Sequence, residues 1–390
     1  MEATRKKTAL VLSGGGSRGA YQIGVWQALT ELGIPIDIVT GSSVGAVNGA
    51  AIAQNLLEPA RSMWESLDTE TVFHFSEIRK NGGGNYDEFK KLLAAKLDEA
   101  EIRSSDVELG LVTVEFPSME PCHLWKEDIP QGKLLDYILA SASCFPAVRG
   151  YQIGGETYID GGYGDNLPVE MALERGAKRI IAVNLETPGI VRKKALARAE
   201  EVVFIESDWN LGNWLKFDAG NTKRIMRLGY LEAMKAFGVF DGHLYTFVRG
   251  AADKHNMRGA EQAAAVFELD PGLIYSREVF NERLAEALAE YEQYGEKEIA
   301  EGEARIARLT EESELLKTFL EKNVSVKNVL NELLARLAKL PPVNSKTLTL
   351  LLANYIRRTG QERRARFSKP VLALFRREID AAYFLAQKMK

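Results

Sequence analysis

Cysteine, histidine and long apolar runs are all scarce in this sequence. Two cysteines, Cys122 and Cys144, occur among its 390 residues, which is too few for a disulfide framework and favours a reducing compartment. No run reaches the roughly 18 apolar residues that a membrane-spanning helix needs. Residues 1–12 are polar and then only briefly apolar, so they do not predict a signal peptide. We therefore expect a cytoplasmic protein whose contact with a membrane, where it has one, is peripheral.

A large excess of charge of either sign is also missing. The formal net charge is −4, so bulk charge does not predict nucleic acid as a partner. With 46% hydrophobic and 27% charged residues, the composition is that of an ordinary soluble globular protein. On a prior of roughly 150 residues for each domain, the length predicts about two or three domains with room for a large core.

What the chain does contain is a Gly-x-Ser-x-Gly segment at residues 41–45. Residues 34–40 before it are typical of a strand, and the small apolar residues after it are typical of a buried helix. A serine between strand and helix is the nucleophile-elbow pattern, in which the glycines make room for a sharp turn. The spacing selects Ser43 rather than Ser42, although an ordinary Gly/Ser turn is the alternative. The N–H of Val44 would then face a developing oxyanion at the helix N-terminus.

A glycine loop follows the first predicted strand, residues 8–12. Gly14, Gly15 and Gly16 are consecutive there, and glycine permits backbone conformations in which several N–H groups converge on one anion. Because the carboxyl ends of neighbouring parallel strands lie side by side, this loop and the serine turn should face one crevice. The glycine N–H groups are therefore expected to join that of Val44 in an oxyanion hole.

The same loop permits a second interpretation. Gly14, Gly16 and Gly19 fit the Gly-x-Gly-x-x-Gly pattern of dinucleotide-binding proteins. Asp37 stands near the spacing of the ribose-binding acid, but at the start of its strand instead of the carboxyl end, which disfavours this use. Arg18 would orient the loop or attract a phosphate, and a structural salt bridge is its alternative role.

An aspartate at the end of another short predicted strand is the candidate partner of the serine. Asp160 is followed by two glycines, which add no bulk and let the carboxylate approach another loop closely. Desolvation there would raise its pKa towards that of a useful general base. Asp165 is a second candidate, more typical of a turn or a helix cap. A histidine triad remains the alternative, because His243 and His255 follow Asp160 in the chain order of α/β-hydrolases.

Taken together, these motifs resemble those of the patatin-like phospholipases. The glycine loop 14–19, the serine turn 41–45 and Asp160-Gly161-Gly162 stand in the order of that family's three motifs, and the likeness spans roughly residues 7–250. The resemblance implies an α/β fold, with a mostly parallel central sheet flanked by helices in three layers. It also implies a serine–aspartate dyad without histidine that cleaves acyl esters of lipids through an acyl-enzyme.

Carried over by position, the resemblance makes Ser43 the nucleophile and Asp160 the base, with oxyanion donors at Gly15, Gly16 and Gly14. We expect a lipid acyl hydrolase of the phospholipase A, lysophospholipase or carboxylesterase type that requires neither a cofactor nor a metal. The alternatives are a catalytically silent lipid-binding or regulatory protein and a nucleotide-binding module. The glycine-rich stretch Asn81–Asn85 is a surface loop or a mobile lid over the acyl site.

The predicted strands stop near residue 272, which predicts a catalytic domain over residues 1–270 and a helical C-terminal region over residues 271–390. From Glu278 to Glu321 there are 13 acids against 5 bases, a net of −8, whereas from Arg357 to Lys390 there are 10 bases against 3 acids, a net of +7. Helices of opposite charge that face each other or water explain this asymmetry. The functional alternatives are docking of the basic segment on an anionic membrane and a surface for an oligomer or another partner.

Overall fold

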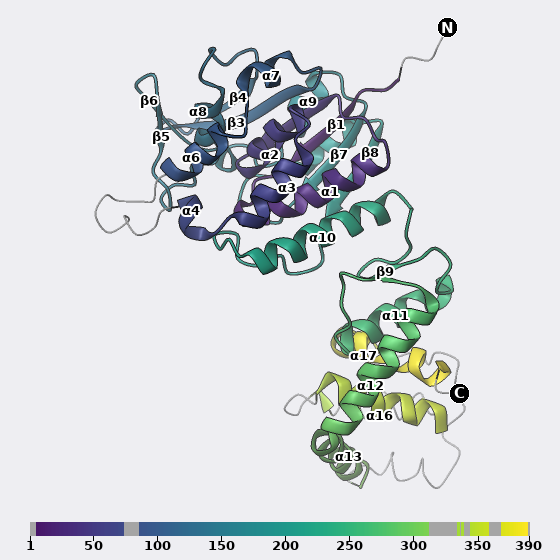
Figure 1. Ribbon diagram of the computed structural model, residues 1–390. Helices are drawn as coiled ribbons and strands as arrows, with labels where there is room; N and C mark the ends of the chain where they lie inside the picture. The colour runs from purple at the N-terminus through teal and green to yellow at the C-terminus, as the bar shows by residue number, and fades with distance from the viewer. Residues whose placement is uncertain are drawn as a thin grey trace. The chain divides into compact units, whose positions relative to one another are not determined.

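The computed structural model describes residues 5–73, 86–311, 334–335, 337–338, 344–358 and 368–388 (Figure 1). The stretch Asn81–Asn85, where the sequence suggested a lid, lies outside these residues. The chain divides into two compact units, Met1–Gly238 and Val239–Lys390. The functional division at residue 270 stays a prediction.

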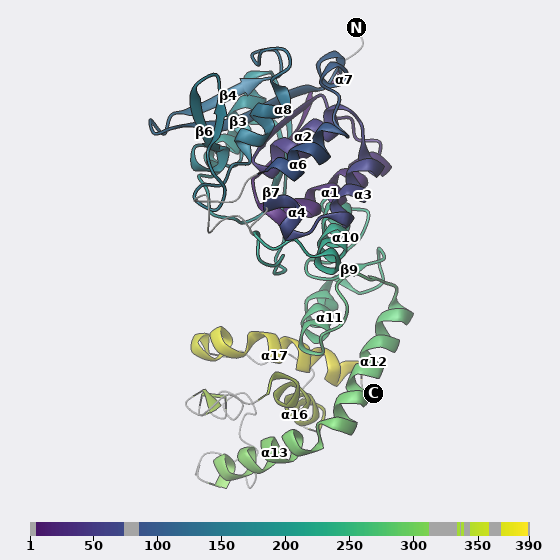
Figure 2. The same ribbon diagram turned by 60° about the vertical axis from the view of Figure 1, so that its left-hand side comes forward.

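The first unit is built on an eight-stranded sheet in which strands run in the order β5-β6-β3-β2-β1-β7-β8, with β4 paired to β3. The strands β3, β2, β1, β7 and β8 pair in parallel, whereas β4, β5 and β6 pair antiparallel. In Figure 2, β4 and β6 lie beside β3 at one edge. The strands are β1 Thr8–Leu12, β2 Ile38–Ser42, β3 Glu108–Phe116, β4 Pro121–Trp125, β5 Tyr151–Ile153, β6 Glu156–Asp160, β7 Arg179–Asn184 and β8 Glu201–Glu206.

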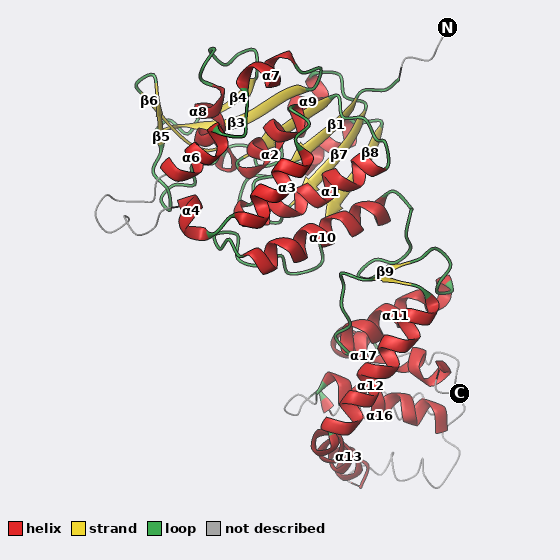
Figure 3. Ribbon diagram, in the orientation of Figure 1, coloured by secondary structure: helices red, strands yellow, loops and turns green. Residues whose placement is uncertain are grey.

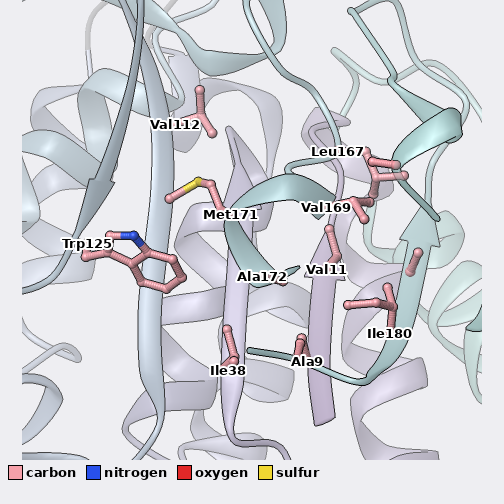
Figure 4. Close-up of a cluster of buried hydrophobic side chains, with 13 residues drawn as sticks. Ala9, Val11, Ile38, Val112, Trp125, Leu167, Val169, Met171, Ala172 and Ile180 are labelled. Atoms are coloured by element: carbon pink, nitrogen blue, oxygen red, sulfur yellow. The ribbon is translucent and has the colours of Figure 1, made fainter. Parts of the chain in front are cut away.

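Helices cover both faces of this sheet, because its central strands are apolar on both sides. Ala9 and Val11 of β1 pack against α9 in the cluster of Figure 4, while Leu10, which alternates with them, is fully buried on the opposite face. The predicted α/β class with a mostly parallel central sheet is confirmed. The helices are α1 Ala20–Glu31, α2 Val44–Ala53, α3 Leu57–Ser66, α4 Thr69–Phe73, α6 Asp87–Ala94, α7 Glu99–Ser104, α8 Leu134–Ser141, α9 Val169–Glu174 and α10 Ala219–Ala236.

The second unit is mainly helical (Figure 3). Its described helices are α11 Lys254–Val266, α12 Arg277–Tyr294, α13 Glu296–Glu311, α16 Ser345–Arg358 and α17 Lys369–Lys388. The short strand β9, Thr246–Phe247, pairs in parallel with β10, Ile274–Tyr275, in a separate two-stranded sheet. Within the described ranges, no helix has the length and apolar character needed to cross a membrane.

Candidate active site

Ser43 occupies a strained turn between β2 and α2. Its φ of 54° and ψ of −125° put a non-glycine residue in a sparsely populated region, as a nucleophile elbow requires. Its N–H donates to Ser141 Oγ at 2.9 Å, which helps to hold the turn. Ser43 lines a cavity, whereas the neighbouring Ser42 is fully buried and its Oγ has no hydrogen-bond partner in the described part of the chain.

Asp160 meets the hydroxyl of Ser43. Ser43 Oγ donates to Asp160 Oδ2 at 2.6 Å, and the N–H of Gly162 donates to Asp160 Oδ1 at 2.8 Å. The register of the sheet explains the encounter, because Ser42 pairs with Val112 on β3 and the next β3 residue pairs with Asp160. Burial raises the pKa of Asp160 to about 6, although the hydrogen bonds from Ser43 and Gly162 oppose this shift.

The glycine loop lies against the same serine. A Cβ added at Gly14 would stand 3.0 Å from Ser43 Cβ. The Gly14 N–H donates to both carbonyl oxygens of Asn166, the backbone O at 3.2 Å and Oδ1 at 3.1 Å, so it is already engaged. In the described residues, no acceptor binds the N–H groups of Gly15 and Gly16. Val44 is the first residue of α2, where a backbone N–H has no partner within the helix.

The orientation of the Gly15 N–H follows from contacts on the preceding carbonyl. The Gly14 carbonyl oxygen accepts from Thr187 Oγ1 at 2.8 Å and from Ser13 Oγ at 3.1 Å. Because a trans peptide is planar, its N–H points away from its C=O. These two hydroxyls therefore fix the direction of the Gly15 N–H, which is a role that the sequence did not suggest for either residue.

Arg18 fastens the glycine loop to two other loops. Its guanidinium donates to the carbonyl oxygens of Leu185 and Glu186, each at 2.9 Å, and twice to that of Gly212, at 2.8 and 2.9 Å. Partial burial lowers its pKa from the ordinary value. Its bonds thus run to backbone carbonyls rather than to the carboxylate of a salt bridge, and they fit the loop-orienting role.

A mostly apolar cavity of about 470 Å³ opens beside the pair of Ser43 and Asp160. Large side chains from α3, α4, α6 and the segment before α10 form its walls, namely Trp64, Leu67, Val72, Phe73, Tyr86, Phe89, Trp214 and Phe217. Gly14, Gly15, Gly16 and Val44 line the same cavity. The structure therefore places all the predicted site residues except Arg18 at this cavity. Arg18 does not line the cavity and instead binds the glycine loop to two neighbouring loops.

A buried polar chain connects the wall of the cavity to the glycine loop. Trp64 Nε1 donates to Asn48 Oδ1 at 2.9 Å, Asn48 Nδ2 donates to Gln22 Oε1 at 2.8 Å, and Gln22 Nε2 donates to the Ser13 carbonyl at 2.7 Å. A fully bonded buried network of this kind rigidifies its surroundings. The sequence signal for this chain is that Gln22 and Asn48 are polar residues within the largely apolar helices α1 and α2.

The alternative candidate acids have other partners. Asp165 does not cap α9, whose N-cap is Pro168; instead Asp165 is buried, with Oδ2 3.2 Å from His123 Nε2 and 3.5 Å from Arg192 Nη1. Asp37 precedes β2, at the end of the strand opposite Ser43, and accepts from the N–H of Thr8. It therefore does not stand where a dinucleotide ribose would need an acid. Among the described residues, no three His, Cys, Asp or Glu side chains gather as a metal site.

Comparison with known proteins finds similarity to one family. Residues 10–173 match the family model described as patatin-like phospholipase. Patatin-like phospholipase domain-containing protein 7 of Rattus norvegicus is 30% identical over 199 residues, which cover 47% of this chain and 14% of that protein. Lysophospholipase nte1 of Aspergillus terreus is 31% identical over 193 residues, which cover 46% of this chain and 12% of that protein. The chain thus matches only a small part of each of these relatives.

Among solved structures, VipD from Legionella pneumophila is similar at a TM-score of 0.41 and 14% identity, covering 99% of this chain and 90% of that chain. The family match spans the glycine loop, Ser43 and Asp160, the residues on which the resemblance was first based. The part of the chain from residue 10 to residue 173 is therefore similar to the patatin-like phospholipases, in agreement with the resemblance of its motifs.

Proposed function

We propose that this protein hydrolyses acyl esters of lipids through an acyl-enzyme on Ser43. The observation that carries the proposal is the 2.6 Å hydrogen bond from Ser43 Oγ to the buried Asp160 at an apolar cavity. Asp160 takes the Ser43 proton as Oγ attacks the ester carbonyl, and the proton passes to the departing alcohol. Asp160 then takes a proton from water, which attacks the acyl-enzyme. As the bond between the acyl carbon and Ser43 Oγ breaks, Asp160 returns this proton to Oγ and the fatty acid leaves.

The backbone N–H groups of Gly15, Gly16 and Val44 would stabilise the oxyanion in both steps. The N–H groups of Gly15 and Gly16 meet no acceptor in the described residues, and Val44 adds the positive end of α2. Gly14 would contribute indirectly, since its own N–H is held by Asn166 while its carbonyl sets the direction of the Gly15 N–H. Each well-placed donor of this kind is worth about 3 kcal/mol in other hydrolases.

A lipid with a single acyl chain is the substrate we expect. The cavity of about 470 Å³ is mostly apolar, so it suits an acyl chain better than a charged headgroup. A relative whose name is lysophospholipase is consistent with this choice. Fatty acid release from lysophosphatidylcholine should exceed release from dioleoylphosphatidylcholine in matched detergent micelles. Equal rates would contradict the single-chain preference without affecting the dyad.

The cytoplasmic location and the docking of the basic C-terminal segment on an anionic membrane stay predictions, as does an oligomer surface on that segment. The described part of the segment includes α17, whose Lys388 side chain donates to Asn281 Oδ1 at 3.1 Å.

The activity should depend on pH through Asp160. Because burial raises the pKa of this carboxyl to about 6, the base is protonated and inactive below that pH and ionised above it. We expect kcat/KM for a soluble p-nitrophenyl ester to rise about tenfold per pH unit up to pH 6 and then to level off. A profile measured from about pH 4.5 to about pH 8, with circular dichroism to confirm folding, tests this. A flat profile across pH 6 would exclude Asp160 as the titrating base.

Thr187 should affect catalysis more than binding. Thr187→Val keeps the shape of the side chain but removes the hydrogen bond to the Gly14 carbonyl. We expect kcat to fall by about tenfold with KM nearly unchanged, because the Gly15 N–H is then less well aimed at the oxyanion. Thr187→Ser retains the hydroxyl and should restore most of kcat. An equal loss in both variants would indicate a packing role instead.

A further inference from the structure

Exposed apolar side chains of the first unit are concentrated in one place. Among its described residues, six large hydrophobic side chains are exposed. Three of them come from cavity-lining segments near residues 145, 163 and 190, and two come from the end of β3 and the turn after it. The sixth, Val202, is on the edge strand β8. We call the five residues the mouth surface: Phe116, Met119, Phe145, Tyr163 and Ile190.

Direct contacts connect three members of the mouth surface, and the other two are close neighbours of these three. The rings of Phe116 and Phe145 have centroids 5.5 Å apart, and Tyr163 Oη donates to the Phe145 carbonyl. Met119 follows Phe116, the last residue of β3, by three residues and lies in the turn between β3 and β4. Ile190 is joined to the neighbour of Tyr163, since its N–H donates to the Gly162 carbonyl at 3.0 Å. Contiguous apolar patches of this kind mark interaction sites more often than scattered apolar residues do.

The mouth surface is continuous with the cavity that holds Ser43. Tyr163 and Ile190 line that cavity and are at the same time 39% and 48% exposed. An acyl chain that enters between them leaves one apolar environment for another. Transfer of the chain through water would instead expose every methylene, which is unfavourable.

The charged side chains near the mouth surface are of both signs. Arg149 follows Phe145 by four residues and Glu120 follows Met119 directly; both are exposed, and neither forms an ion pair within the described part of the chain. Arg192, also exposed, shares the buried Asp165 with His123. Headgroups that carry both a phosphate and an amine complement such a mixed rim, because the arginines attract the phosphate and Glu120 attracts the amine.

We propose that the mouth surface docks the first unit on a phospholipid–water interface with zwitterionic headgroups. The apolar side chains enter the boundary between headgroups and acyl chains, and Arg149 and Arg192 meet phosphates at its rim. The docking deepens the proposed function, since it brings the cavity to the lipid, but the binding itself does not require hydrolysis. It also differs from docking by the basic C-terminal segment, which would need anionic lipid.

Sedimentation with phosphatidylcholine vesicles tests the docking. The full chain with Ser43→Ala should bind these vesicles without anionic lipid, and about 0.5 M salt should weaken the binding little because screening acts on exposed charge. Adding Phe116→Ser and Met119→Ser should lower the partition coefficient by about tenfold or more. The matched control Val202→Ser, which removes an exposed apolar residue outside the mouth surface, should bind as the parent does.

Three results of the vesicle experiment would each overturn the proposal. These are no binding by the Ser43→Ala parent, undiminished binding by the double variant, and binding that requires phosphatidylglycerol and disappears with salt. Neither Phe116 nor Met119 lines the cavity, so the double variant with Ser43 intact should hydrolyse soluble p-nitrophenyl butyrate at the normal rate. Failure of the wild type to hydrolyse that ester would contradict the proposed function alone and leave the vesicle result standing.

Discussion

Ser43→Ala should abolish ester hydrolysis, with kcat lower by about 10⁴-fold or more, as when the nucleophile of other serine hydrolases is removed. The loss follows from the geometry, because the Ser43 hydroxyl lines the cavity and donates to Asp160. Asp160→Asn keeps a polar group of the same size but cannot accept a proton at neutral pH. We expect a comparable loss of turnover from it.

Intact mass after treatment with a fluorophosphonate ester measures the nucleophile directly. The wild type should gain one adduct, and Ser43→Ala should gain none. Ser42→Ala is the matched control, since Ser42 is one residue away, fully buried, and its Oγ has no partner in the described residues. It should be labelled and turn over nearly as the wild type does. An adduct that persists in Ser43→Ala would place the reactive group elsewhere.

The central sheet and the partnership of Ser43 with Asp160 could be predicted from sequence because their signals, apolar runs and motifs, are local. Apolar runs such as residues 8–12 and 109–114 match β1 and most of β3. The glycines after Asp160 predict a tight turn, and the order of the three motifs pairs this aspartate with Ser43 through the family resemblance. The antiparallel pairing of β6 with β3, which brings Asp160 to Ser43, is a long-range contact that the sequence does not reveal.

Two of the side chains that hold the glycine loop, unlike Arg18, could not be predicted in this way. Asn166 is 152 residues from Gly14, and Thr187 is 173 residues from it. Each side chain acts through a contact that exists only after folding, and a lone Asn or Thr in a loop carries no periodic signal. For the same reason β9 has strand character in the sequence, while its partner β10 could not be chosen from the chain alone.

Gly45→Ala should destabilise the first unit by about 4 kcal/mol or more, the range of severe backbone clashes in a core. A Cβ at Gly45 would stand 2.4 Å from the Leu12 carbonyl oxygen and 2.9 Å from its carbon. These are backbone atoms of the central strand β1, so they cannot move aside as a side chain would. Urea unfolding followed by circular dichroism measures the change.

Gly49→Ala, one turn further along α2, is the matched control. There the nearest atom to the new Cβ is Leu109 Cδ1, at 3.2 Å, and a leucine side chain can shift by a few tenths of an ångström. Alanine also gains about 1 kcal/mol over glycine inside a helix, so we expect a change close to zero. If both substitutions lower the free energy of unfolding equally, the close approach of α2 to β1 is not what requires Gly45. If only Gly45→Ala lowers it strongly, Gly45 is needed because it lets α2 approach β1 closely. This approach places the N–H of Val44 beside the loop after β1, where an oxyanion would lie.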